Sequence, residues 1–98
     1  MLEDTTALQA EYRELTAERL PAQATAAWPV QADHCFQRIV LDALFEDVWY
    51  DHVADRPAVE SLTADQLREA IAIAESLLDD PDRVVELNRA SLRYRDEL

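Results

Sequence analysis

The 98-residue sequence contains no glycine and no lysine, and Cys35 is its only cysteine. Glycine is the residue that tight β-hairpins favour at positive φ, and phosphate loops and dinucleotide-binding folds need it for close backbone approach. A single cysteine excludes an intramolecular disulfide and gives no sign of an oxidising compartment. No apolar run approaches the ~20 residues of a membrane-spanning helix, and the acidic N-terminal segment does not resemble a signal peptide. These absences argue against nucleotide-binding loops and predict a soluble, cytoplasmic protein that does not enter a membrane.

The charged residues are strongly unbalanced. Twenty-one Asp and Glu face nine basic residues, all of them arginine, for a net charge of −12. An acidic surface without lysine is typical of proteins in molar salt, where charge repulsion is screened within about 3 Å at 1 M ionic strength. The composition predicts a halophilic protein, with an ordinary acidic protein as the alternative. In a halophile the negative charge is an adaptation to the salt of the solvent, so a negative net charge argues only weakly against binding to nucleic acid. Acidic neighbours dilute the C-terminal arginines, however, and nucleic acid is not a predicted partner.

The spacing of apolar residues predicts an all-α fold, a small antiparallel bundle of about four helices. Apolar residues recur every three or four positions, which is typical of helices that bury one face. Residues 1–98 are expected to form a single domain, because the chain is too short for a second core. Within it we expect an N-terminal helix in residues 1–20, a connector over residues 21–32 and core helices over residues 33–95.

The N-terminal helix is expected to begin at about residue 6, with Asp4 or Thr5 as its cap, and to stop at Pro21. It has one narrow apolar stripe, formed by Leu8, Tyr12 and Leu15. Such a stripe could lie in the groove of a partner. In the connector that follows, Trp28 is expected to dock on the core.

Capping patterns mark the last two helices. Thr63 and Gln66 match the capping box Thr-x-x-Gln, after a turn or short helical segment that begins at about Pro57. Asp80 is the expected cap of the last helix and Pro81 its first residue. The last helix is expected to bury one of two rows, either Val84, Leu87, Ser91 and Tyr94 or the offset row Val85 and Leu92.

The second helix is apolar on most sides, yet it carries a line of polar residues. It is expected to run from a cap at Asp33 to between residues 50 and 53, and to place His34, Arg38 and Asp42 along one line with Trp49 nearby. A helix that is apolar on most sides is buried on most sides. A buried charge without a partner costs several kcal/mol, so Arg38 and Asp42 are expected to pair or to meet polar groups of another helix. The candidate partners on the last helix are Asn88, Ser91 and Arg93.

Two interpretations of this line remain open. In the first, it is a structural clasp that fixes how two helices pack. In the second, it is a pocket for an anionic ligand or a catalytic site, with Arg38 as the clamp, His34 as acid or base and Asp42 as the orienting group. A clasp would leave no cavity, whereas a pocket would leave open space beside Trp49.

Other chemistries fail on spacing. His34 and Cys35 are adjacent and would diverge by about 100° on a helix, so they cannot form a thiol–imidazole pair, and Cys35 is expected to pack as an inert apolar residue. His34 and His52 would lie about 27 Å apart on a continuous helix and could not share a metal ion. The segment Asp-Asp-Pro-Asp lacks the glycine of a calcium-binding loop and is expected to cap a helix. No metal and no cofactor are predicted.

The segment "DHCFQRIVLD", Trp49, "RPAVESLTADQLREAIAIAE" and "LNRASLRYR" resemble a family of short, uncharacterised helical proteins. That family shares Asp-His-Cys-Phe, an Arg-x-x-x-Asp spacing and a closing Leu-Asn-x-x-Ser-Leu-x-x-Arg, and the resemblance covers about residues 33–95. Members are sometimes labelled acetyltransferase-like, but a chain without glycine lacks the loop with which those enzymes hold coenzyme A. The positions that the resemblance marks are His34, Cys35, Phe36, Arg38, Asp42, Trp49, Asn88, Ser91 and Arg95.

Two functions are therefore expected from the sequence. The first is a helical module that acts by association with a second copy or with a partner protein, in line with an apolar fraction of 49% in a small chain. The second is binding of, or catalysis on, a small anionic molecule. This second function would use His34, Arg38, Asp42 and Trp49, with Asn88, Ser91 and Arg95 across a cleft.

Overall fold

The computed structural model describes residues 5–53 and 58–96, and within these ranges the protein is all-α, as predicted, with no strand. The helices are α1 (Thr6–Glu14), α2 (Leu20–Gln23), α3 (Asp33–Phe45), α4 (Ala64–Asp79) and α5 (Pro81–Tyr94). A π-helical segment, η1 (Leu15–Arg19), joins α1 to α2 without a break, and two short 3-10 segments, η2 (Trp49–Asp51) and η3 (Ala58–Ser61), lie between α3 and α4.

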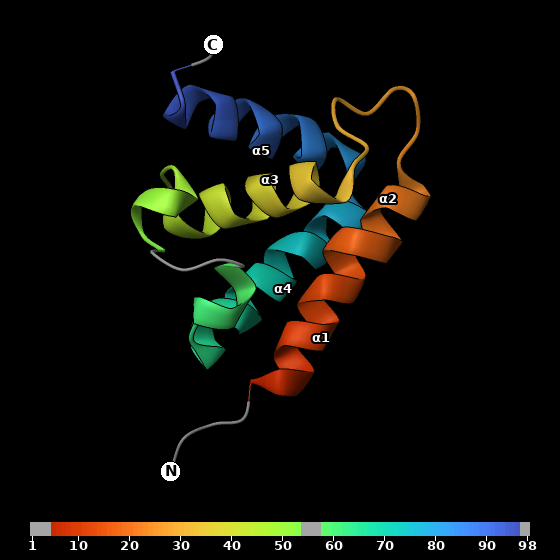
Figure 1. Cartoon of the computed structure of the whole chain (residues 1–98). Coiled ribbons are helices and arrows are strands. Elements are labelled where there is room, and N and C mark those ends of the chain that lie inside the picture. Colours follow the sequence, from red (N-terminus) through yellow and green to blue (C-terminus); the bar gives the residue numbers. More distant parts are fainter. Residues whose placement is uncertain (1–4, 54–57, 97–98) are drawn as a thin grey trace.

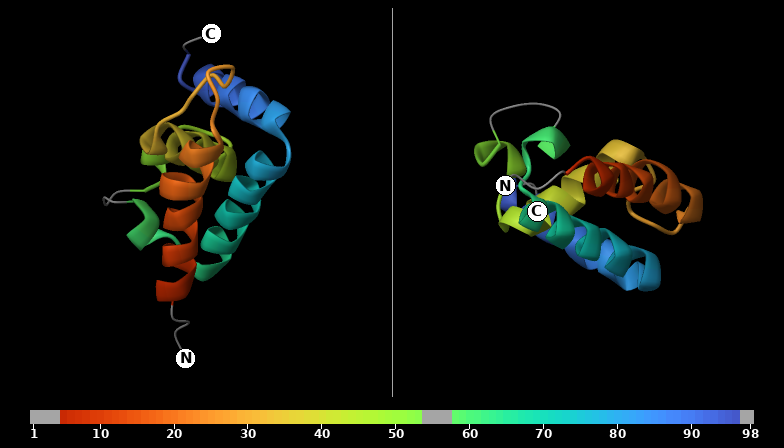
Figure 2. Two further views of the ribbon diagram at one scale, coloured as in Figure 1. Left: turned by 90° about the vertical axis from the view of Figure 1, so that its right-hand side faces the viewer. Right: turned by 90° about the horizontal axis from the view of Figure 1, so that it is seen from below.

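The helices form two contacting pairs. α3 and α5 lie side by side, and α1 and α4 form the second pair beneath them (Figure 1; Figure 2, left). α3 and α5 run in the same direction, because α4 returns the chain to the side on which α3 began. In an up-and-down bundle successive helices alternate in direction, so each helix runs parallel to the second helix after it. The molecule measures 44 × 28 × 18 Å.

The N-terminal helix continues past Pro21, so the prediction that Pro21 ends it was wrong. Pro21 is the second residue of α2 and directly follows the π-helical turn η1, so it lies inside a continuous helical stretch, which has one backbone N–H donor fewer at that position. The wider turn of η1 precedes it, and α2 ends at Gln23. Thr5 holds the N-cap position of α1, but its side chain accepts from Gln9 Nε2 (3.0 Å) and not from the backbone. Asp4 lies outside the described residues.

α3 ends at Phe45, earlier than the sequence predicted, and Asp33 is its first residue, one after the N-cap. Glu46 follows in the left-handed region at φ 53°, and the Asp47 N–H donates to the Asp42 carbonyl (3.2 Å). This is the usual closure of a helix by a left-handed residue. Glycine normally takes that position, and in this glycine-free chain Glu46 occupies it at a cost of roughly 1–2 kcal/mol.

The core takes residues from all of the long helices. The stripe of α1 lies inside it, with Tyr12 and Leu15 each 2% exposed. Leu8, the third residue of the stripe, is partly buried against the core, so this chain's own helices cover most of the stripe and leave little of it for a partner, contrary to expectation. Trp28 docks on the core as predicted, with its ring edge-on to Phe36 at 6.0 Å. The fully buried apolar side chains from the other elements include Leu20, Phe36, Ile39, Val40, Leu67, Leu77 and Val84.

The predicted caps of α4 and α5 are confirmed. The Gln66 N–H donates to Thr63 Oγ1 (3.1 Å), and the Thr63 N–H donates to Gln66 Oε1 (2.9 Å). Asp80 Oδ1 accepts from the Asp82 N–H (3.0 Å) at the start of α5. α5 buries Val84 and Ser91 of its first predicted row, and Leu87 of that row is partly buried against the core, but Tyr94 at the end of the row and Val85 of the other row are exposed. Pro57, the expected start of the preceding turn, lies outside the described residues.

Candidate functional site

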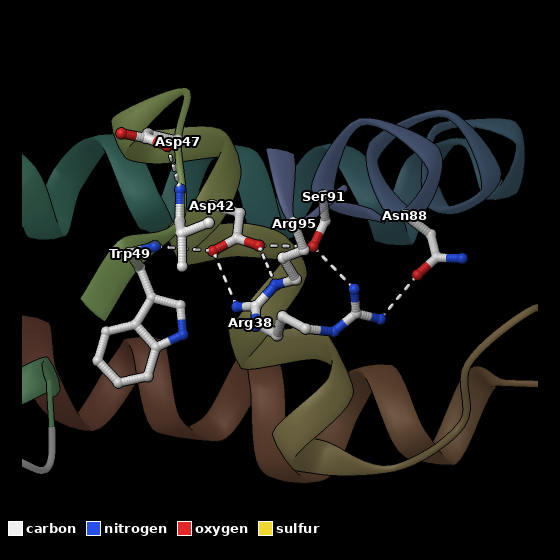
Figure 3. Close-up of polar contacts among 8 residues, drawn as sticks. Arg38, Asp42, Asp47, Trp49, Asn88, Ser91 and Arg95 are labelled. Carbon is white, nitrogen blue, oxygen red and sulfur yellow. Dashed lines mark hydrogen bonds and ion pairs between the residues drawn. The ribbon is translucent and has the colours of Figure 1, made fainter. Parts of the chain in front are cut away.

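The carboxylate of Asp42 lies at the centre of a polar cluster between α3 and α5 (Figure 3). It is fully buried and accepts four hydrogen bonds. The Ser91 hydroxyl donates to Oδ2 (2.6 Å), and Arg95 donates through Nε to Oδ2 (3.0 Å) and through Nη2 to Oδ1 (3.3 Å). The Trp49 backbone N–H donates to Oδ1 (3.0 Å). A buried carboxylate is stable only when charge and hydrogen bonds compensate its lost hydration, and Asp42 has both.

Arg38 is joined to Asp42 through Ser91. Its Nη1 donates to Ser91 Oγ (2.7 Å), while the same hydroxyl donates its proton to Asp42. Its Nη2 donates to Asn88 Oδ1 (2.7 Å), and Figure 3 shows the guanidinium directed at both α5 side chains. Arg38 and Asp42 thus meet polar groups of another helix. We call Arg38, Asp42, Asn88, Ser91 and Arg95 the polar clasp.

Arg93, an expected partner of this line, is exposed on α5 and contributes nothing to the clasp, whereas Arg95 supplies the charge that faces Asp42. The Arg95 side chain is 17% exposed, and its guanidinium carbon also lies 5.2 Å from the centre of the Tyr50 ring. A cation against an aromatic face gains further stabilisation. The clasp therefore ties α5 both to α3 and to the segment that follows α3.

Asp42 also determines where Trp49 lies. Its carbonyl accepts the Asp47 N–H that closes α3, and its carboxylate accepts the Trp49 N–H seven residues along the chain. These two bonds turn the backbone back, and the Trp49 ring points away from Asp42 toward α1 (Figure 3). Trp49 thus contacts Asp42 through its backbone N–H, and its indole ring faces α1.

The indole of Trp49 lies at a cavity of about 250 Å³, which we call the Trp49 cavity. It lies between α1, α3 and the two 3-10 segments. Among the described residues that line it, no side chain is a carboxylate. Three are cationic or can become cationic: Arg13, His34 and Arg38. Glu60 approaches Arg13 only to 4.0 Å. The remaining wall is aromatic or neutral: Tyr12, Gln37, Leu41, Ala58 and Val59.

His34, like Trp49, is a predicted site residue that does not belong to the polar clasp. Its side chain is 81% exposed, and its Nδ1 lies 3.6 Å from Asp33 Oδ1. It lines the Trp49 cavity one turn before Arg38. The polar line of α3 is thus divided. Asp42 lies in the clasp, His34 lies at the cavity, and Arg38 belongs to both, so the two interpretations of the line are not exclusive.

Tyr12 is the wall residue that the sequence did not point to, because it matched the apolar stripe of α1. It is 2% exposed, and its hydroxyl has no hydrogen-bond partner among the residues that the structure describes. Burial raises the pKa of this phenol above its usual value, so the hydroxyl stays protonated and remains a donor. An unsatisfied buried hydroxyl costs about 1–3 kcal/mol, and such exceptions call for an explanation.

The remaining candidates behave as ordinary structural groups. Cys35 is a free, partly buried thiol against the core. His52 stacks on Phe45 at 5.0 Å and contacts Asp47 Oδ2 through Nε2 (3.1 Å), far along the chain from His34. The Val48 N–H and then His52 hold the pKa of the Asp47 carboxyl below its usual value. Within residues 5–53 and 58–96, no three His, Cys, Asp or Glu side chains are grouped so as to hold a metal ion.

Comparisons with protein-family models, with curated proteins and with solved structures find no match for this chain. No helix in the described part of the chain is both long enough and apolar enough to span a membrane.

Proposed function

We propose that this protein binds a small anionic molecule in the Trp49 cavity. The observation that carries the proposal is the charge of the wall. The chain has 21 acidic residues and a net charge of −12, yet the described wall brings together Arg13, His34 and Arg38 and contains no carboxylate. A random surface of such a chain would be acidic. A cationic recess in it concentrates anions and repels cations.

The polar clasp supports the proposal by fixing Arg38. Asn88 and Ser91 take two of the five N–H donors of its guanidinium, so the group is held in place before a ligand arrives. A clamp that is already ordered loses less entropy on binding. In this account Asp42 and Arg95 do not touch the ligand. They position Arg38 through Ser91 and position Trp49 through its backbone.

The cavity also restricts the ligand's size and shape. The cavity volume of about 250 Å³ is below the usual range of roughly 300–1,000 Å³ for pockets that bind drug-sized ligands. This volume favours a molecule no larger than a single small ring. Trp49, Leu41 and Val59 give it an apolar wall, so a purely ionic ligand would leave part of the wall without contacts. A carboxylate on a small apolar body fits both halves of the cavity.

Isothermal titration calorimetry with benzoate, at a fixed KCl concentration, tests the proposal. Wild type is expected to bind one benzoate saturably and more tightly than acetate. Arg13→Gln should weaken binding roughly three- to fivefold, a modest factor because Arg13 is half exposed. Arg93→Gln makes the same charge change on the exposed face of α5, outside the cavity, and should leave binding unchanged. No saturable binding, or equal loss in both variants, would overturn the proposal.

Association with a second copy or a partner protein remains the second candidate. The observation that favours it is the exposure of three large apolar side chains: Tyr50 (47%), Val85 (43%) and Tyr94 (38%). Sedimentation at increasing protein concentration tests it, and a monomer at all concentrations would count against self-association.

The composition supports a further proposal about habitat, that the protein works in the cytoplasm of a cell that holds molar salt. The absence of lysine and the net charge of −12 carry it. If this is right, the thermal midpoint rises steeply between low and molar KCl as repulsion is screened. A midpoint that does not change with KCl would remove the support.

A further inference from the structure

The outer face of α5 carries a strip of largely exposed residues, which we call the α5 strip. It consists of Asp82, Val85, Glu86, Arg89, Ala90 and Arg93, which line one recess, and no other described element contributes to that lining. Spacings of three and four residues place them on one face of the helix, opposite the buried Val84 and Ser91. α5 lies at an edge of the molecule (Figure 1), so this face is open to a partner.

The charges of the α5 strip are separated by sign. Asp82 and Glu86 lie toward the start of α5 and Arg89 and Arg93 toward its end, so the strip is neutral in a chain of net charge −12. The helix dipole favours an acid in the first turn and a base in the last, which accounts for Asp82 and Arg93. Its effect falls off within one turn, so it does not account for Glu86 and Arg89. The strip also has two pairs of like charges four residues apart, which weaken an isolated helix.

The charged side chains of the strip have few partners within the chain. Glu86 Oε1 accepts from Arg83 Nη1 (2.6 Å), three residues earlier. Within residues 5–53 and 58–96, no ion pair joins Asp82, Arg89 or Arg93 to another side chain. The second oxygen of Glu86 and the other three groups can therefore meet charges on another molecule.

We infer that the α5 strip is the contact surface of a symmetric dimer, in which α5 of a second copy packs against it in the antiparallel direction. This inference rests on the second candidate function, association with a second copy, and gives it a surface. Positions 82 and 93 share their midpoint with positions 86 and 89, at the middle of α5. A two-fold axis there places Asp82 against Arg93 of the second copy and Glu86 against Arg89 of the second copy. Each pair occurs twice, so the contact contains four ion pairs.

The same charges exclude the parallel arrangement. Two parallel copies of α5 related by a two-fold axis would place each residue against its own counterpart, so Asp82 would face Asp82 and Arg93 would face Arg93. Like charges opposed across an interface suppress association. Opposite charges meet only in the antiparallel direction.

The expected dimer is weak. Val85, which is 43% exposed, and Ala90 flank the charged residues and add apolar area. The contact uses one face of a 14-residue helix, about 21 Å long, from each copy. Interfaces of such limited size belong to weak, transient complexes.

Sedimentation of two charge-reversed variants tests the inference. At about 0.3 M KCl screening acts within roughly 5–6 Å, which removes the long-range repulsion between acidic copies. Wild type is expected to dimerise as its concentration rises from about 10 µM to about 1 mM. Arg89→Glu/Arg93→Glu makes every charged pair of the dimer acidic, and Asp82→Arg/Glu86→Arg makes every pair basic. Each variant alone should associate at least about tenfold more weakly, whereas an equimolar mixture should dimerise again, because all four ion pairs re-form between the two variants.

The variants carry their own control for net charge. Both remain acidic overall, so attraction between net charges cannot produce the mixed dimer. Arg19→Glu/Arg68→Glu makes the same charge change on exposed side chains outside α5 and should leave association unchanged. A wild type that stays monomeric at about 1 mM would overturn both the inference and self-association. A wild-type dimer that survives either reversal, or a mixture that stays monomeric, would overturn the inference and leave self-association through another surface standing.

Disulfide cross-linking tests the antiparallel direction. Asp82→Cys and Arg93→Cys, each with Cys35→Ala, are mixed and oxidised, and both keep the charges at positions 86 and 89. In the antiparallel dimer positions 82 and 93 face each other within the roughly 7 Å that a disulfide allows between Cα atoms. Each position lies about 16 Å along the helix axis from its own counterpart. The mixed disulfide should therefore predominate, and homodisulfides that form as readily as the mixed one would overturn the inference.

Discussion

Asp42→Asn is expected to lower the stability of the fold by about 3 kcal/mol. Asp42 is fully buried, and its two oxygens accept from Ser91, from Arg95 twice and from the Trp49 backbone. Asparagine keeps the shape but replaces one acceptor by an NH₂ donor that faces other donors, and it leaves the charge of Arg95 unpaired. Breaking a buried ion pair costs roughly 3–5 kcal/mol, and the partial exposure of Arg95 places this case at the lower end.

Urea and thermal unfolding, followed by far-UV circular dichroism at one KCl concentration, measure this loss. For a domain of this size, about 3 kcal/mol corresponds to a fall of roughly 12–24 °C in Tm. Asp65→Asn is the matched control, because it removes the same charge from a side chain that is 97% exposed, and its Tm should stay close to that of wild type. A loss below about 1 kcal/mol in Asp42→Asn would refute the claim that the clasp holds α3 to α5.

Three further predictions concern single interactions. Ser91→Ala should cost about 2 kcal/mol in urea unfolding, since it removes the hydroxyl that is both donor and acceptor in the clasp; a neutral effect would contradict this. Thr63→Ala should cost about 1 kcal/mol through the lost cap of α4, whereas Thr63→Ser should restore it. Asp47→Asn should lower Tm slightly at neutral pH, because hydrogen bonds from Val48 and then His52 lower the pKa of Asp47 in the folded state. Because the folded-state pKa of Asp47 lies below the ordinary value of 3.8, the ionised carboxylate stabilises the fold above that pH, and this contribution is lost as the pH falls through the lowered pKa. The Tm difference between wild type and Asp47→Asn should therefore vanish in acid, and a difference that persists there would refute the assignment.

The helices and their caps could be predicted because they depend on neighbouring residues. The capping box at Thr63 and Gln66 and the cap at Asp80 involve residues no more than three positions apart, and they form as predicted. The end of α3 could not be predicted in the same way. The residues after Phe45 are apolar enough to continue a helix, but the Asp42 carboxylate captures the Trp49 N–H and a left-handed Glu46 replaces the usual glycine.

The candidate site was predictable in its residues and not in its arrangement. The burial argument placed Arg38 and Asp42 against polar groups of α5, and the resemblance named Arg95, which faces Asp42. Sequence spacing could not show that Ser91 links the two charges, or that His34 faces solvent. Tyr12 carries no signal in the sequence, because its place in the apolar stripe is the same whether its hydroxyl has a partner or not.

The central claim, that an anion binds beside Trp49, is tested most directly by fluorine NMR. The chain has two tryptophans, Trp28 and Trp49, so protein labelled with 5-fluorotryptophan gives two signals, and Trp28→Phe assigns them. Trp28 packs on Phe36 and is not part of the cavity wall. Titration with benzoate at constant KCl should shift the Trp49 signal saturably and leave the Trp28 signal in place. If neither signal moves, or if both move together without saturation, benzoate does not bind in the cavity and the account of this site is wrong.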